Sequence, residues 1–110
     1  MMPTIDDWNC YTLMLVQALL GVISGNFRMV TLEFAGDRWI ATAMLFEESQ
    51  TDRDKFLDAI DEFSIFVEDV KPQLSPDAYR KIVGKIEVGA QPVESHVSND
   101  LRTIFRLREA

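Results

Sequence analysis

Cysteine and long apolar runs are scarce in this sequence, and each scarcity argues against a class of protein. Cys10 is the only cysteine, so no disulfide can form within the chain, and a lone cysteine mildly favours a reducing compartment. The most apolar stretch, residues 13–23, is too short to span a bilayer and is interrupted by Gln17 and Gly21. Acids stand near the N-terminus, where a secretion signal carries positive charge. We therefore expect a cytoplasmic protein.

Basic side chains are also in deficit. The 110 residues hold 11 lysines and arginines against 18 acids, which leaves a net charge of −7. Residues 1–70 hold 4 basic and 13 acidic side chains, a net of −9, whereas residues 71–110 hold 7 and 5, a net of +2. The overall excess of acidic residues argues against nucleic acid and anionic membrane as partners, because both need a basic face. It suits a protein partner with a basic surface.

Motifs for catalysis, cofactors and metals are missing as well. The chain has no G-x-S-x-G, phosphate-binding glycine loop, H-E-x-x-H or C-x-x-C sequence. The single histidine, His96, stands beside Ser95 in a polar segment and is better explained as a solvent-exposed loop residue. The acidic run from Glu47 to Asp58 lacks the alternating spacing of a calcium loop. We expect no catalytic residue, cofactor or metal. An enzyme of unknown type would need a pocket with perturbed carboxylates.

The first helix is expected from Thr4, a good N-cap, to about Ser24, where Gly25-Asn26 would supply left-handed backbone. From residue 13 onward this helix has almost no polar side. A helix of that kind is either buried all round or covered by a partner.

A β-hairpin follows. Residues 27–35 and 38–46 alternate as strands do, and Gly36-Asp37 between them is a two-residue turn signal. Both faces of the second strand are largely apolar, which predicts a central position in the sheet.

The second helix is expected from a cap at Ser49 or Thr51 to about Val70. Its core stripe repeats in steps of four and three: Phe56, Ile60, Phe63, Val67 and Val70. Residues 82–88 suggest a third strand, residues 89–100 a loop, and residues 101–108 a strand rather than the helix that would also fit. The sequence thus predicts one domain over residues 1–110. Its class is α+β, with an antiparallel sheet of about four strands and two main helices packed on it, in the order α-β-β-α-β-β.

The outer side of the second helix is the candidate partner-binding surface. Between Asp58 and Asp69 it carries no basic residue, so its like charges repel at a cost of a few tenths of a kcal/mol per pair. Ile65 lies among these acidic residues, and an apolar residue surrounded by charge is typical of a binding hot spot. The alternative is a single exposed isoleucine, which needs no explanation. The candidate residues are Asp54, Asp58, Asp61, Glu62, Ile65, Glu68 and Asp69.

Two segments resemble a known class of proteins: residues 18–32, ALLGVISGNFRMVTL, and residues 52–63, DRDKFLDAIDEF. Together they resemble immunity proteins of bacterial contact-dependent inhibition and other polymorphic toxin systems, over roughly residues 15–66. The resemblance implies a non-catalytic complex with a cognate toxin domain, often a nuclease, whose basic surface would meet the acidic helix. It carries no functional residue by itself.

We expect a monomer or weak dimer in isolation. The alternative is an acidic chaperone of the type III secretion kind, which would form a homodimer.

Overall fold

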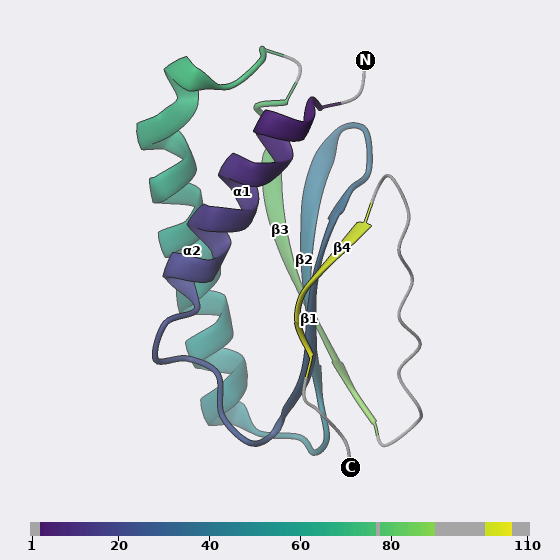
Figure 1. Cartoon of the computed structure of the whole chain (residues 1–110). Helices are drawn as coiled ribbons and strands as arrows, with labels where there is room; N and C mark the ends of the chain where they lie inside the picture. Colours follow the sequence, from purple (N-terminus) through teal and green to yellow (C-terminus); the bar gives the residue numbers. More distant parts are fainter. Residues whose placement is uncertain (1–2, 77, 90–100, 107–110) are drawn as a thin grey trace.

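Two helices and four strands form the described part of the chain, which in the computed structural model comprises residues 3–76, 78–89 and 101–106. In chain order the elements are α1 (Ile5–Ala18), β1 (Phe27–Phe34), β2 (Arg38–Leu45), α2 (Gln50–Val70), a 3-10 turn η1 (Lys71–Gln73), β3 (Lys81–Val88) and β4 (Leu101–Arg106). The expected α+β class and its α-β-β-α-β-β order are confirmed (Figure 1).

Both helices begin at side-chain caps that the sequence predicts. The Thr4 hydroxyl accepts a hydrogen bond from the Asp7 amide at 3.1 Å, and the Asp7 carboxylate accepts one from the Thr4 amide at 2.8 Å. This reciprocal pair satisfies two amides that would otherwise lack a partner at the start of α1. At the start of α2 the Ser49 hydroxyl accepts from the Asp52 amide at 3.2 Å.

The end of α1 differs from the expectation. The helix stops at Ala18 rather than near Ser24, and the left-handed residue is Gly21, with a φ of 80°, rather than Gly25-Asn26. The following residue, Leu19, is only 6% exposed. Leu19 keeps right-handed backbone angles and packs into the core, and the left-handed backbone of Gly21, two residues later, turns the chain away from the helix axis.

The four strands form one sheet in the order β3-β2-β1-β4. The expected hairpin joins β1 to β2: the Ala35 amide donates to the Arg38 carbonyl at 2.8 Å, and Gly36 has a φ of 88°. Strand β2 is central, as its two apolar faces predict. β4 pairs antiparallel with β1, so residues 101–106 are a strand; residues 90–100 and 107–108 of the expected loop and strand lie outside the described residues.

One strand pair is parallel. β3 runs beside β2 in unbroken register from Arg38↔Lys81 to Leu45↔Val88. Parallel neighbours need a long crossover connection, and α2 supplies it between the two strands. The sheet is therefore mostly antiparallel.

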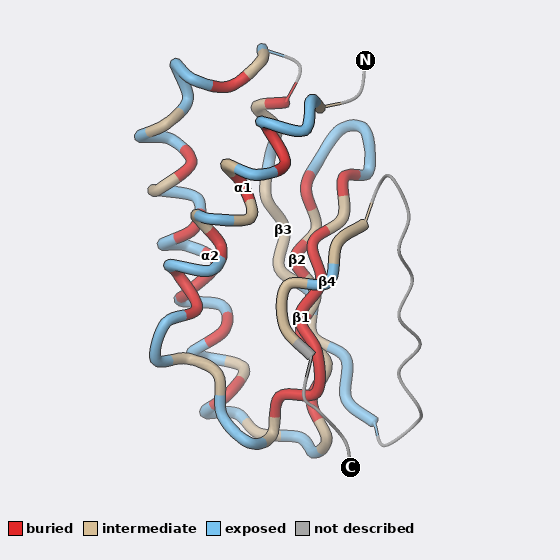
Figure 2. Tube along the Cα trace, viewed as in Figure 1, coloured by how far each residue is buried: buried red, intermediate tan, exposed pale blue. Residues whose placement is uncertain are grey.

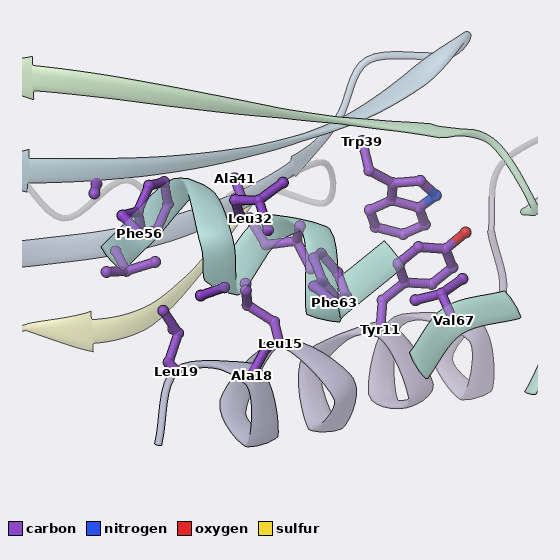
Figure 3. Close-up of a cluster of buried hydrophobic side chains, with 14 of the residues drawn as sticks. Tyr11, Leu15, Ala18, Leu19, Leu32, Trp39, Ala41, Phe56, Phe63 and Val67 are labelled. Atoms are coloured by element: carbon purple, nitrogen blue, oxygen red, sulfur yellow. The ribbon is translucent and has the colours of Figure 1, made fainter. Parts of the chain in front are cut away.

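The core lies between the helices and one face of the sheet. Tyr11 of α1 stacks on Trp39 of β2, with ring centroids 4.0 Å apart. The Phe63 ring of α2 packs edge-to-face with the Tyr11 ring, at a centroid distance of 5.9 Å (Figure 3). The Tyr11 hydroxyl and the Trp39 indole both donate to the Ala78 carbonyl, at 3.0 and 2.8 Å. These buried donors are thereby satisfied, as burial requires.

The two helices divide the covered face of the sheet between them. α2 lies over β3, where a Cβ added at Gly84 would stand 3.0 Å from the Ile60 side chain. α1 lies toward β4, where the Arg102 guanidinium donates to Asn9 at 3.0 Å and sits 5.2 Å from the Trp8 ring centroid. The buried positions of both helices face the strands, and their exposed positions face away (Figure 2).

Candidate functional site

The outer side of α2 carries all seven candidate residues, and every one is exposed to solvent. We call this set the α2 acidic surface; its members are Asp54, Asp58, Asp61, Glu62, Ile65, Glu68 and Asp69. The opposite side of the same helix is buried at Phe56, Ile60, Phe63 and Val67, whereas Val70 at the helix end is only partly buried. Successive residues turn by about 100°, so burial of one stripe directs the acids outward.

Few groups in the described chain contact these carboxylates. Asp54 accepts a hydrogen bond from the Gln50 amide at 2.8 Å, and Glu68 accepts one from the Tyr79 hydroxyl. Among the residues that the structure describes, no lysine or arginine forms an ion pair with any acid of this surface.

Several of the cations that could have neutralised the surface are engaged elsewhere. Arg53, on the same helix, pairs with Glu48 at 2.6 Å, and Lys85 of β3 pairs with Glu87 at 3.1 Å. The ammonium of Lys71 lies over the Tyr79 ring, 4.3 Å from its centroid.

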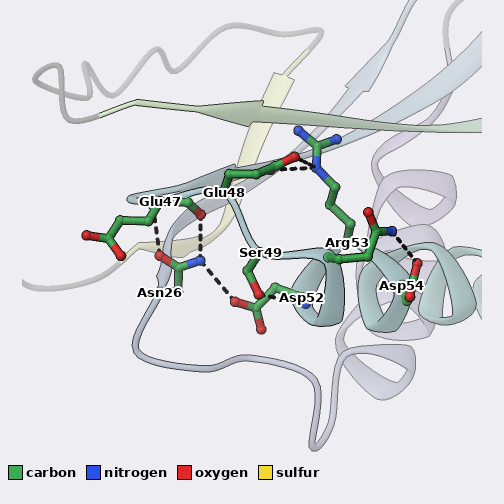
Figure 4. Close-up of polar contacts among 8 residues, drawn as sticks. Asn26, Glu47, Glu48, Ser49, Asp52, Arg53 and Asp54 are labelled. Atoms are coloured by element: carbon green, nitrogen blue, oxygen red, sulfur yellow. Dashed lines mark hydrogen bonds and ion pairs between the residues drawn. The ribbon is translucent and has the colours of Figure 1, made fainter.

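The Asp52 carboxylate, just before the surface, has a structural task. Asp52, only 9% exposed, accepts from the Ser24 hydroxyl at 3.2 Å and from the Asn26 amide at 2.9 Å. The Asn26 side chain also donates to the backbone carbonyl of Glu47 at 2.8 Å and accepts from the backbone amide of Glu47 at 2.9 Å (Figure 4). This network ties the loop before β1 to the start of α2. Within residues 3–76, 78–89 and 101–106, no three or more His, Cys, Asp or Glu side chains are arranged to hold a metal ion.

Two buried titratable groups also serve the fold. Burial raises the pKa of Asp7, but hydrogen bonds from the backbone amides of Ser75 and Thr4 outweigh it, and the pKa lies below its ordinary value. The Ser75 bond is 3.0 Å long and joins α1 to the turn after α2. Burial raises the pKa of Tyr11 to about 12.

A cavity that the sequence did not reveal borders the acidic surface. Its volume is about 430 Å³, and its wall combines α2 with the approach to β3: Ser64, Val67, Glu68, Tyr79, Arg80, Lys81 and Ile82. Glu68 belongs to both the cavity and the acidic surface. Cys10 is half-buried in α1, and Ser95 and His96 lie outside the described residues. Among the described helices, none has the length and apolar character to cross a membrane.

Comparison with known proteins identifies the family of this chain. Residues 10–83, about two thirds of the chain, match the family described as MafI2 immunity protein. The matched segment includes β1, β2, α2 and the whole α2 acidic surface. No curated protein matches the chain. The expectation of an immunity protein is confirmed at this level, and the matching family is the Maf one rather than one named for contact-dependent inhibition.

Proposed function

Since the chain belongs to the MafI2 immunity protein family, we propose that it blocks its cognate Maf toxin by docking the α2 acidic surface on a basic surface of that toxin. A MafI2 immunity protein is non-catalytic and neutralises its toxin, so the chemistry to be explained is recognition. Membership of this family favours an immunity role over the chaperone alternative.

The observation that carries the proposal is the lack of internal compensation along α2. Asp58, Asp61, Glu62 and Asp69 are exposed, and no described lysine or arginine pairs with them. Like charges three and four residues apart destabilise a helix. A surface that keeps this arrangement gains from it when a positively charged partner arrives.

The partner chemistry follows from the geometry of the charges. Carboxylates along one side of a helix present a row of negative charge, as a nucleic-acid backbone does with its phosphates. A toxin that cleaves nucleic acid needs a basic surface for its substrate. The α2 acidic surface would occupy that surface as a phosphate mimic, and we propose a nuclease as the toxin. Nucleic acid is the substrate that such a toxin meets in the cytoplasm, where the immunity protein would act.

Ile65 gives the surface an apolar centre. Its side chain is 61% exposed and is flanked along the helix by Asp61 and Asp69, one turn away on either side. Binding energy concentrates in central apolar or aromatic contacts, whereas surrounding charges mainly steer association. Ile65 therefore supplies contact energy, and the acids supply speed and orientation.

Charge reversal at Asp58→Lys and Asp61→Lys tests the proposal. Association with the purified cognate toxin domain should slow by roughly tenfold or more, because steering charges act on the association rate. The dependence of the affinity on salt concentration should also weaken. Surface plasmon resonance between about 50 and 500 mM NaCl measures both effects, since screening of the charges strengthens as the salt concentration rises over this range.

The matched control reverses two acids away from this surface, Glu47→Lys and Glu87→Lys. Both double variants change the net charge from −7 to −3, so a difference between them reports position rather than total charge. Equal association rates for the two would refute docking through α2. A cognate toxin that binds the wild type but shows no nuclease activity would refute the phosphate-mimic part.

A further inference from the structure

The outer face of α1 carries an apolar stripe that the fold leaves exposed. Leu13 is 57% exposed, Val16 42% and Leu20, just past the helix end, 75%. The spacing of three residues places Leu13 and Val16 on one side of the helix, opposite the buried Tyr11 and Leu15, and the exposed Leu20 follows in the turn after the helix. The sequence left two alternatives for this helix, burial all round or cover by a partner. The exposure of these three residues rules out the first.

The stripe is also free of charge. No Asp, Glu, Lys or Arg occurs from Trp8 through Phe27. The outer side of a helix packed on one face of a sheet normally carries charged and polar residues. Scattered exposed apolar residues need no explanation, but an aligned set without neighbouring charge is typical of an interaction surface.

This stripe and the α2 acidic surface both lie on the sides of their helices that face away from the core. Both helices pack on the same face of the sheet, α1 toward β4 and α2 toward β3, and they contact each other along the layer (Figures 1 and 2). Packed helices lie about 8–10 Å apart. The outward side of the helical layer therefore has an apolar row beside an acidic row.

We infer that the helical layer binds the toxin as one composite surface, in which the α1 stripe buries apolar contacts and the α2 acidic surface pairs with cations. The inference rests on the proposed function and adds to it the chemistry of the partner: a basic surface with an apolar patch at its border. Protein interfaces commonly have this anatomy, an apolar centre with a polar rim.

Charge decides between this occupant and a second copy of the chain. Each chain carries a net charge of −7, and two copies joined through α1 would bring their α2 acids close to one another. Like charges juxtaposed at an interface oppose association. A cationic partner is instead attracted to the acidic row that adjoins the stripe.

The test uses the double variant Leu13→Gln and Leu20→Gln, with Val88→Gln as control. Glutamine is nearly as good a helix former as leucine, and both replaced side chains are exposed, so the variant should fold; Leu13→Ala with Leu20→Ala is the second variant. The control removes a side chain that is 42% exposed at the end of β3, outside the helical layer. Surface plasmon resonance against the cognate toxin domain, and sedimentation of each variant alone, give the readouts.

The Leu13/Leu20 variant should dissociate roughly ten times faster or more, with an unchanged salt dependence, because lost apolar contacts act mainly on dissociation. The Val88 variant should bind as the wild type does. If the wild type fails to bind the toxin, the proposed function itself is wrong. If binding responds to the Asp58/Asp61 variant but not to the α1 variants, only the composite surface is overturned. A wild-type dimer that the α1 variant converts to a monomer, with unchanged toxin affinity, would assign the stripe to self-association and also overturn it.

Discussion

Replacing Asp58 by lysine should make the free protein more stable, although the same position is proposed to bind the partner. Asp58 has four neighbours on the helix surface at three and four residues: Asp54, Lys55, Asp61 and Glu62. Three of them are acids, and all four are exposed. With aspartate at the centre, three pairs repel and one attracts. With lysine, three pairs attract and one repels.

The expected gain follows from this count. Each charged pair of this kind contributes about 0.2–0.5 kcal/mol, with a sign set by the two charges. The replacement changes the sign of all four pairs, and the gain from the three pairs with acids exceeds the loss from the pair with Lys55. The net gain in the free energy of unfolding is therefore about 1–2 kcal/mol at low salt, to which the better helix propensity of lysine adds a few tenths.

Urea denaturation of the free protein at about 20 mM and 1 M NaCl measures this gain. Salt should remove most of it, because the Debye length falls to about 3 Å at 1 M. Glu48→Lys is the control with the same change of charge: it breaks the pair with Arg53 and should lower the stability by less than about 1 kcal/mol. If Asp58→Lys leaves the stability unchanged or lowers it at low salt, the acids of α2 are already compensated, and the reasoning for a docking surface fails.

Two further predictions concern the core. Tyr11→Phe should lower the free energy of unfolding by about 1 kcal/mol or less, because Trp39 still donates to the Ala78 carbonyl. The pKa of Tyr11 is raised to about 12 in the folded state, above the unfolded value near 10. The wild type should therefore lose stability as the pH rises from 10 to 12. Urea denaturation from pH 8 to 12 should show a smaller loss for the variant, and equal losses would contradict this role of Tyr11. Gly84→Ala should lower the free energy of unfolding by about 1–2 kcal/mol, because its Cβ would meet Ile60 at 3.0 Å; an equally stable variant in the same assay would show that α2 can shift away from β3.

Placing recognition on an exposed helical layer separates binding from folding. The residues proposed to contact the toxin are exposed, whereas the core depends on the other sides of the same helices. Replacement of a contact residue should therefore alter partner choice at little cost in stability. Discrimination between toxins would then depend on charge and shape at this surface, where mismatched charges oppose the wrong partner.

Local patterns in the sequence were sufficient for much of the fold and for the candidate surface. The Gly36-Asp37 turn predicts the hairpin because few other dipeptides favour its backbone conformation. The steps of three and four along α2 predict both its buried stripe and the acids on the opposite side, and Ser49, one of two candidate caps, is where the helix starts. Each of these inferences compares residues within one or two turns of the chain, so the necessary information lies in a short segment.

Tertiary structure decided the features that join distant segments. Residue order alone did not place β3 parallel to β2, because an edge strand can pair in either direction and the crossover of α2 selects one. The structure ends α1 at Ala18 and turns the chain at the left-handed Gly21, whereas the apolar pattern continues to residue 23. The exposure of Leu13 depends on the core covering only one side of that helix. Periodicity identifies an apolar helix, but only the arrangement of its neighbours determines which of its sides is left open to a partner.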